Sequence, residues 1–174
     1  QKGGVAKTTT AITLAAALAD TGHAVLVIDL DAQACATFSL GIDPEDLPPR
    51  TVDFLLDDLP SGEGAAQMRS AIRTTDEGFS LLPATLSLAS ADVSLADRPA
   101  RERILSRVLD EIRDTFDVIV IDCSPSLGLT TINALVAADD VLVPFKCETL
   151  SHRGLGQLME SIDEVKRWSN PDLR

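Results

Sequence analysis

Two apolar runs that each end in an aspartate constrain the fold of this chain most strongly. The first, HAVLVIDLD, covers residues 23–31, and the second, FDVIVIDCSPS, covers residues 116–126. Short runs of this kind are typical of strands that are buried on both faces of a parallel sheet. Because parallel strands need long crossover connections, helices are expected between them. The two runs therefore predict an α/β protein.

The segments around these runs complete an alternating pattern. A helix is expected at 7–22 that stops at Gly22, since glycine is favoured just after a helix end. Further helices are expected at 51–59, 64–75, 99–115, 129–139 and 151–168, and further strands at 79–84 and 140–145. In the 99–115 helix one face carries the apolar residues Ile104, Leu105, Val108, Leu109 and Ile112. The pattern predicts a mostly parallel β-sheet with helices on both faces, a three-layer α/β/α arrangement, in one domain over residues 1–174.

Composition limits the function classes. The formal net charge of −12 argues against strong nucleic-acid binding by this stretch alone. No apolar run approaches the roughly 18 residues that a membrane-spanning helix needs. The three cysteines, Cys35, Cys123 and Cys147, form no CxxC pair, so a metal or cluster site built from thiolates is not expected.

The N-terminal stretch QKGGVAKTTT carries most of the chemistry. It departs from the standard phosphate loop, GxxxxGK[ST], because Gln1 and Ala6 stand at the two glycine positions. Lys7 is expected to reach the β- and γ-phosphates of a nucleotide, and the Thr8 hydroxyl is expected to bind Mg²⁺. Backbone N–H groups at the start of the following helix would add to the phosphate site. The residues expected to contact the nucleotide are Lys2, Gly3, Gly4, Val5, Ala6, Lys7, Thr8 and Thr9.

Three aspartates end the two buried runs: Asp29, Asp31 and Asp122. In open α/β sheets ligands bind at the carboxyl ends of the strands. A buried carboxylate rarely lacks a partner, and Mg²⁺ is the obvious partner beside a phosphate loop. Helix capping or simple solvation at the strand ends is the alternative explanation for each of them.

These motifs resemble those of the ParA/MinD family of P-loop ATPases, which have a deviant Walker A loop. KGGVAKTTT is similar to that loop, VLVIDLDAQACATFSLGI to the family's second motif, and FDVIVIDCSPSLG to its Walker B strand. ALVAADDVLVPFKCETLSHRGLGQL looks like the next strand and helix of the ParA branch, which acts in chromosome and plasmid partitioning. The resemblance covers almost the whole chain.

The resemblance implies an ATPase that works as a switch. Members bind ATP and Mg²⁺ and form a homodimer that sandwiches two nucleotides, with the first loop lysine contacting the partner subunit's phosphates; that lysine matches Lys2. Lys2, Lys7 and Asp31 are then the catalytic residues, Asp31 positioning the attacking water. Thr8, Asp29 and Asp122 form the metal site, with Asp122 as the Walker B aspartate. Hydrolysis would be slow and stimulated by a partner.

The resemblance also implies partners and a location. These are a ParB-like centromere-binding protein and non-specific DNA, in a cytoplasmic, nucleoid-associated protein with no membrane span. Family members have a hydrophobic strand before the position of Gln1 and more chain after that of Arg174. The chain is therefore expected to be a truncated P-loop ATPase domain, with the DNA-binding surface in the part after residue 174.

One departure affects the loop directly. Ala6 stands where the family usually has glycine, and alanine disfavours positive φ. We therefore expect Ala6 to have a negative φ and still to present its N–H to phosphate. A positive φ would count against a working loop.

Three other functions remain open. A MinD-like membrane-positioning ATPase would need a C-terminal amphipathic helix. A cluster carrier, such as a nitrogenase reductase or an Mrp-type protein, would need cysteine ligands at the dimer face. A non-hydrolysing nucleotide-binding module is the third alternative, against which Lys2, Lys7, Thr8, Asp31 and Asp122 together argue.

Overall fold

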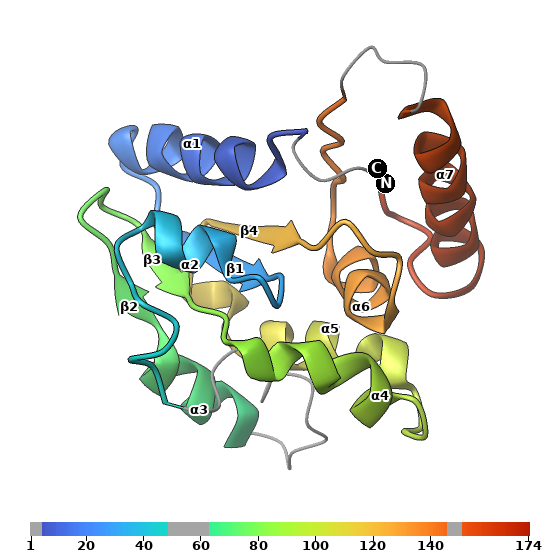
Figure 1. The fold of residues 1–174 in the computed structure, drawn as a ribbon, viewed down its shortest axis with the longest axis horizontal. Helices are drawn as coiled ribbons and strands as arrows, with labels where there is room; N and C mark the ends of the chain where they lie inside the picture. Colours follow the sequence, from blue (N-terminus) through green and yellow to red (C-terminus); the bar gives the residue numbers. More distant parts are fainter. Residues whose placement is uncertain (1–4, 49–62, 146–150) are drawn as a thin grey trace.

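A computed structural model describes residues 5–48, 63–145 and 151–174 of the chain. Its sheet has the strand order β2-β3-β1-β4 (Figure 1). Strand β1 (Val25–Leu30) pairs in parallel with β3 (Ser80–Leu82) on one side and with β4 (Val118–Cys123) on the other. The two-residue β2 (Arg73–Thr74) is antiparallel to β3. The predicted α/β class with a mostly parallel sheet is therefore confirmed.

Helices cover both faces of this sheet. Helix α1 (Lys7–Asp20) packs through Ala15 on the face that presents Val25 and Val27 of β1. The opposite face presents Leu26 and Ile28, because successive strand residues point to opposite sides. It is covered by α3 (Glu63–Ala71), α4 (Ala91–Leu95), α5 (Ile104–Asp110) and α6 (Leu129–Ala137). The predicted three-layer α/β/α arrangement is present.

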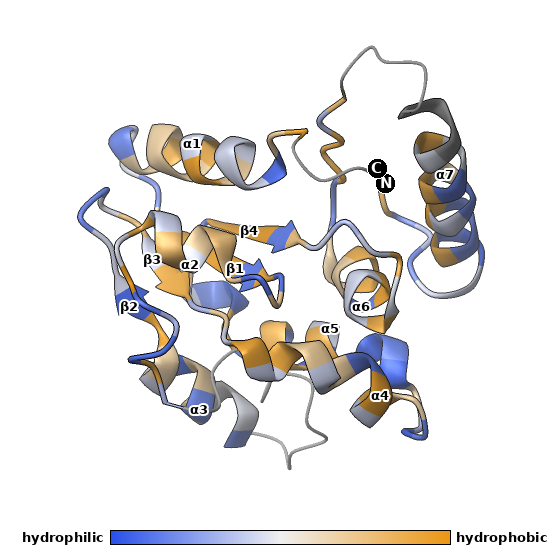
Figure 2. Ribbon diagram, in the orientation of Figure 1, coloured by the Kyte–Doolittle hydropathy of each residue, from blue (hydrophilic) through white to orange (hydrophobic). Residues whose placement is uncertain are grey.

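The two strands predicted first lie side by side in register, with Asp29 opposite Asp122. All of β1 is buried. Figure 2 shows apolar strands whose carboxyl ends, at the arrowheads of β1 and β4, turn hydrophilic. Asp29 and Asp122 therefore lie at the same edge of the sheet.

Helix α1 ends where the sequence predicts. Gly22 has a φ of 92°, its N–H donates to the Ala19 carbonyl, and the His23 N–H donates to the Leu18 carbonyl. This pair of hydrogen bonds is a Schellman motif, which satisfies carbonyls at the helix end and requires the left-handed conformation that glycine adopts without strain. Helix α7 (Ser151–Trp168) also has its predicted bounds.

Three predicted helices are shorter than expected, one of them the 129–139 helix, which ends at Ala137. The 64–75 helix ends at Ala71, and residues 73–74 form β2 instead. The 99–115 helix is divided into the 3₁₀ turn η3 (Arg101–Arg103), α5 and the 3₁₀ turn η4 (Arg113–Thr115). Ala100 has a φ of 48°, so no right-handed helix passes through it. The apolar face was predicted correctly: Ile104, Leu105, Leu109 and Ile112 are buried and Val108 is partly buried.

The strand predicted at 140–145 is absent, because residues 138–145 form no ladder with the sheet. Instead, the Val141 N–H donates to the Arg174 carbonyl, and the Arg174 N–H donates to the Asp139 carbonyl. A cavity of about 800 Å³ is lined by β4 together with α1, α6, Leu142 and Pro144.

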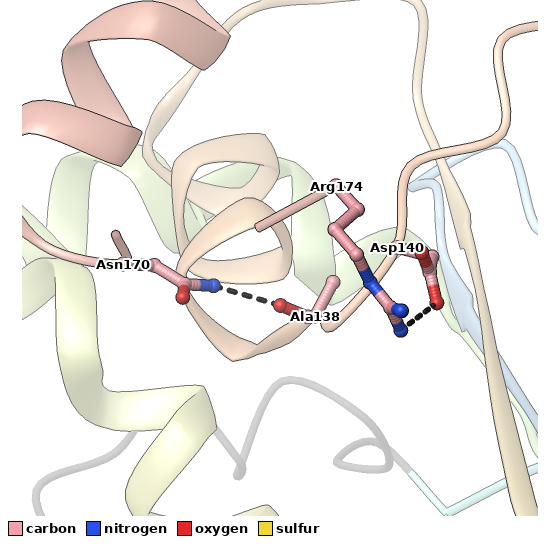
Figure 3. A network of polar contacts seen from close by, with 4 residues as sticks. All are labelled: Ala138, Asp140, Asn170 and Arg174. Carbon is pink, nitrogen blue, oxygen red and sulfur yellow. Dashed lines mark hydrogen bonds and ion pairs between the residues drawn. The ribbon is translucent and has the colours of Figure 1, made fainter. Parts of the chain in front are cut away.

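The C-terminal segment is fastened to the end of α6 (Figure 3). The Asn170 amide donates to the carbonyls of Leu135, Val136 and Ala138, at 3.1, 3.2 and 2.7 Å. It thereby satisfies carbonyls that a helix end leaves without partners. The exposed Arg174 pairs with Asp140 at 2.9 Å.

Three short helical segments were not predicted: α2 (Cys35–Ser39), η2 (Leu86–Ser90) and α4. The helix predicted at 51–59 lies outside the described residues. No described helix is long and apolar enough to cross a membrane.

Candidate nucleotide-binding site

The phosphate loop leads into α1, whose first residue is Lys7. Lys2, Gly3 and Gly4 lie outside the described residues, so only Val5 to Thr9 of the predicted loop contacts can be placed. Lys7 and Thr8 are partly buried in the first turn of the helix. Helix N-termini carry free N–H groups and a partial positive charge, which suits an anion.

Ala6 contradicts its prediction. Its φ is 66° and its ψ is 29°, so it is left-handed rather than at negative φ. The Ala6 carbonyl accepts the Thr10 N–H at 2.9 Å and the Thr10 hydroxyl at 2.7 Å, so Ala6 is the N-cap residue of α1. The prediction relied on the intrinsic preference of alanine, which the surrounding structure overrides here. A left-handed alanine costs about 1–2 kcal/mol. This is the conformation that a glycine at this position would adopt without strain.

Asp122 is the least satisfied polar group of the site. Its side chain is 2% exposed, and neither carboxylate oxygen has a hydrogen-bond partner of normal geometry among the described residues. The pKa of Asp122 is raised to about 6, mainly by burial and also by the nearby charges of Asp29 and Asp31. The Thr8 hydroxyl and the Lys7 ammonium lower this pKa, so both groups lie close to the carboxylate. The structure therefore brings Lys7, Thr8 and all three aspartates together.

Asp29 is fully buried but has several partners. Its Oδ2 accepts the Thr37 N–H at 2.9 Å and the Thr37 hydroxyl at 2.7 Å, and its Oδ1 accepts the Asp31 N–H at 3.2 Å. Burial raises the pKa of Asp29, and these hydrogen bonds oppose the rise. The contacts are those of a buried structural carboxylate. They lend no support to the predicted magnesium role of Asp29, which stays a prediction.

Asp31 lies in the turn that follows β1 and is partly buried. Its Oδ1 accepts the Gln33 N–H at 3.0 Å, and its carbonyl accepts the Ala34 N–H at 2.8 Å. These bonds hold the backbone of the turn, with Asp31 close enough to Asp122 to raise the pKa of that carboxyl. This placement is compatible with the predicted role in positioning water.

Thr8 and Asp122 fit a magnesium ion. Mg²⁺ prefers oxygen ligands and is bound in nucleotide sites by one or two protein groups together with phosphates and water. The buried Asp122 carboxylate, which makes no hydrogen bond of normal geometry among the described residues, and the nearby Thr8 hydroxyl supply such groups. Within residues 5–48, 63–145 and 151–174 no cluster of three or more His, Cys, Asp or Glu side chains could hold a metal by itself. The protein groups thus suit an ion that arrives with a nucleotide.

Two residues that make hydrogen bonds in this region were not identified from the sequence. Thr37 binds Asp29, and Asp92 of α4 accepts the Thr130 N–H at 3.0 Å near the start of α6. Thr37 lies within the second motif, so its place in the resemblance could have suggested it. Asp92 is 38 residues from Thr130 and belongs to no motif, so no local signal marks it.

Comparisons with known proteins agree with this site. The sequence model of a family described as an AAA domain matches residues 1–174. The chain is 43% identical over 174 residues to the sporulation initiation inhibitor protein Soj of Bacillus subtilis, covering 99% of this chain and 66% of that protein. It is 42% identical over 175 residues to the chromosome partitioning protein ParA of Myxococcus xanthus, covering 100% of this chain and 59% of that protein. The chain thus spans less than two thirds of the length of either curated relative.

Among solved structures, a cobyrinic acid a,c-diamide synthase from Mycobacterium smegmatis with bound ATP analog and magnesium is similar. The identity is 50% and the TM-score 0.89, covering 99% of this chain and 68% of that one.

Proposed function

The chain belongs to the AAA domain family that matches its whole length, and from this premise we propose that it is a ParA-like partitioning ATPase. It would bind ATP with Mg²⁺ at residues 2–9 and hydrolyse ATP to ADP and phosphate. The observation that carries the proposal is the Asp122 carboxylate, which is buried, makes no hydrogen bond of normal geometry among the described residues, and lies near Thr8 and Lys7. The similar structure with bound ATP analog and magnesium supports the choice of ligand.

Each residue of the site has a distinct part in this reaction. Lys7 binds the β- and γ-phosphates, and the α1 N-terminus adds backbone donors. Thr8 and Asp122 hold Mg²⁺, which when bound neutralises phosphate charge. Asp31 orients the attacking water. Catalysis of this kind consists mainly of positioning and charge stabilisation, so the site needs no side-chain nucleophile.

The proposed switch adds dimerisation to hydrolysis. Lys2 would contact the phosphates bound by a second copy of the chain, so that two subunits enclose two nucleotides. A ParB-like protein would stimulate hydrolysis, and non-specific DNA would bind the dimer outside the described residues, on the nucleoid. Similarity to Soj and ParA supports this cycle, which would segregate a chromosome or plasmid.

The test follows the mass of the complete natural protein in solution with ATP and Mg²⁺. Asp31→Ala is expected to form an ATP-dependent dimer, because it binds ATP without hydrolysing it. Asp31→Ala combined with Lys2→Ala is expected to stay monomeric. Asp31→Ala combined with Lys166→Ala is the matched control, since Lys166 is exposed in the last turn of α7. If all three variants ignore ATP, the switch does not exist in this protein.

A non-hydrolysing binding module is the second candidate. The left-handed Ala6 favours it, because its methyl group lies in the loop where glycine is usual. Equilibrium binding of labelled ATP and single-turnover hydrolysis separate the two functions. ATP binding without turnover, restored to turnover by Ala6→Gly, would identify the methyl group as the cause.

The similar structures carry a name that points to a different reaction, amide formation on cobyrinic acid. ATP consumption with and without cobyrinic acid decides between these activities. Hydrolysis that needs no cobyrinic acid supports the ATPase, whereas consumption only in its presence would favour the synthase.

A further inference from the structure

Thr37 joins three elements through one buried hydroxyl. The hydroxyl donates to Asp29 Oδ2 at 2.7 Å and accepts the Ala84 N–H at 2.9 Å. Asp29 ends β1, Thr37 lies in α2, and Ala84 follows β3. Both Thr37 and Asp29 are fully buried, so water does not replace these bonds.

The same carboxylate holds both ends of the segment that carries Asp31. Its Oδ1 accepts the Asp31 N–H, and its Oδ2 accepts the Thr37 N–H at the far end of that segment. A carboxylate that binds partners through both oxygens cannot rotate without losing one of them. The Thr37 hydroxyl therefore fixes the orientation of Asp29, and through it the start of the Asp31 turn.

We propose that Thr37 is a positioning residue for ATP hydrolysis, acting through Asp29 to place Asp31 over the reacting phosphate. The inference rests on the proposed ATPase function and adds a residue that the sequence motifs did not assign. Thr37 does not belong to the phosphate loop, so its effect falls on turnover and not on nucleotide affinity. Misplacement of a catalytic group by about 1 Å can lower a rate by about 100-fold.

The test compares three variants of the complete natural protein. Thr37→Val keeps the shape of the side chain and removes the hydroxyl, while Thr37→Ser keeps the hydroxyl. Thr75→Val is the matched control, because Thr75 is also buried and its hydroxyl donates at 2.8 Å to the Phe79 carbonyl, next to the β2–β3 turn. For each variant the melting temperature, the ATP dissociation constant and kcat are measured.

Thr37→Val is expected to lower kcat by about 10- to 100-fold and to change the ATP dissociation constant less than about threefold. Thr37→Ser is expected to restore kcat to within about threefold of the parent. Thr75→Val is expected to lower the melting temperature without lowering kcat. Equal kcat in Thr37→Val and the parent overturns the proposal, and so does an equal loss of kcat in both valine variants.

If Thr37→Val does not fold, Asp29→Asn provides the test. An amide has one acceptor oxygen, so it can keep the Thr37 bonds but loses the bond to the Asp31 N–H. Its kcat is expected to fall about tenfold with unchanged ATP affinity. Unchanged kcat in a folded Asp29→Asn variant overturns the positioning role. A parent protein without ATP turnover would instead remove the proposed function itself, which separates the two failures.

Discussion

Asp29 and Asp122 occupy equivalent places at the ends of two paired strands, yet their surroundings differ completely. They are opposite each other in the β1–β4 register, and both are buried. Asp29 accepts three hydrogen bonds, two of them from Thr37. Asp122 accepts none of normal geometry from the part of the chain that the structure describes. The oxygens of Asp29 are thus occupied by hydrogen bonds within the protein, whereas those of Asp122 are not.

The pKa values follow from this difference. Burial acts on both carboxyls and raises both pKa values, but hydrogen bonds from Thr37 and from the Asp31 backbone oppose the rise at Asp29. At Asp122 the pKa reaches about 6, because the Thr8 hydroxyl and Lys7 only partly compensate for burial. A buried ionised carboxylate without donors is costly unless a cation accompanies it. Such a site is a functional candidate, whereas a satisfied carboxylate at the same level is a structural one.

The largest expected effect concerns magnesium. Asp122→Asn should raise the Mg²⁺ concentration needed for half-maximal ATP hydrolysis by about 10- to 100-fold, because groups that support a metal site usually contribute this much. Asp29→Asn should shift it by less than about twofold, whatever its effect on kcat. The measurement is the hydrolysis rate against Mg²⁺ at fixed ATP. If the half-maximal Mg²⁺ concentration rises equally in the two variants, Asp29 supports the metal as much as Asp122 does.

The second prediction concerns stability at pH 8 without nucleotide. Asp122→Asn should raise the free energy of unfolding by up to about 3 kcal/mol, the equivalent of moving the pKa from 3.8 to about 6. Asp29→Asn should lower the free energy of unfolding by about 1–3 kcal/mol, since the partly buried Asp31 N–H then loses its acceptor. Urea unfolding of both variants beside the parent measures this. Destabilisation by both substitutions would mean that Asp122 also has structural partners.

The stabilisation by Asp122→Asn should depend on pH. The pKa of Asp122 is raised in the folded protein, so its ionisation destabilises the fold as the pH rises from about 4 to about 6. The free energy of unfolding of Asp122→Asn should therefore exceed that of the parent by about 1.5 kcal/mol at pH 5 and by about 3 kcal/mol at pH 8. Unfolding curves at both pH values test this, since subtracting the parent cancels the other titrating groups. If this difference in the free energy of unfolding becomes smaller as the pH rises, the pKa of Asp122 is not raised in the folded protein.

The segments that follow the two aspartates are also held differently. After Asp122 the support comes from α4, whose Asp92 accepts the Thr130 N–H. A Cβ on Gly128 would clash with Asp92 Oδ2. Gly128→Ala should therefore displace Asp92 and destabilise the protein by about 1–2 kcal/mol. Gly156→Ala is the control, because its Cβ would meet nothing within 4 Å inside a helix. The measurement is the melting temperature of each variant. Equal melting temperatures for Gly128→Ala and Gly156→Ala would show that the Asp92 side chain moves aside at little cost.

The smallest effect is expected at Ala6. Ala6→Gly should raise the free energy of unfolding by about 0.5–1 kcal/mol, since glycine removes the strain of the positive φ but loses more entropy on folding. Ala100→Gly is the matched control, because Ala100 is also exposed and left-handed but lies away from the site. If Ala6→Gly alone also increases ATP affinity, the methyl group hinders the nucleotide as well as the backbone.

Local sequence signals determined most of the architecture. Apolar runs, helical periodicity and Gly22 each act over a few residues, and they located β1, β4, α1, α6 and α7. The phosphate loop and the three aspartates were likewise recognisable, because their residue types and spacing follow directly from phosphate and metal chemistry. The family resemblance rests on the same short motifs.

Only the tertiary structure decided what each of these residues does. The partners of Asp29 come from α2 and, through Thr37, from Ala84, which is 47 residues from Thr37. The 140–145 segment has strand composition but forms no ladder, since a strand requires a neighbour and its backbone pairs with Arg174 instead. Ala6, at the N-cap of α1, adopts a conformation that its residue type disfavours. Burial and hydrogen bonding depend on contacts between distant segments, so two aspartates that look alike in the sequence have different surroundings.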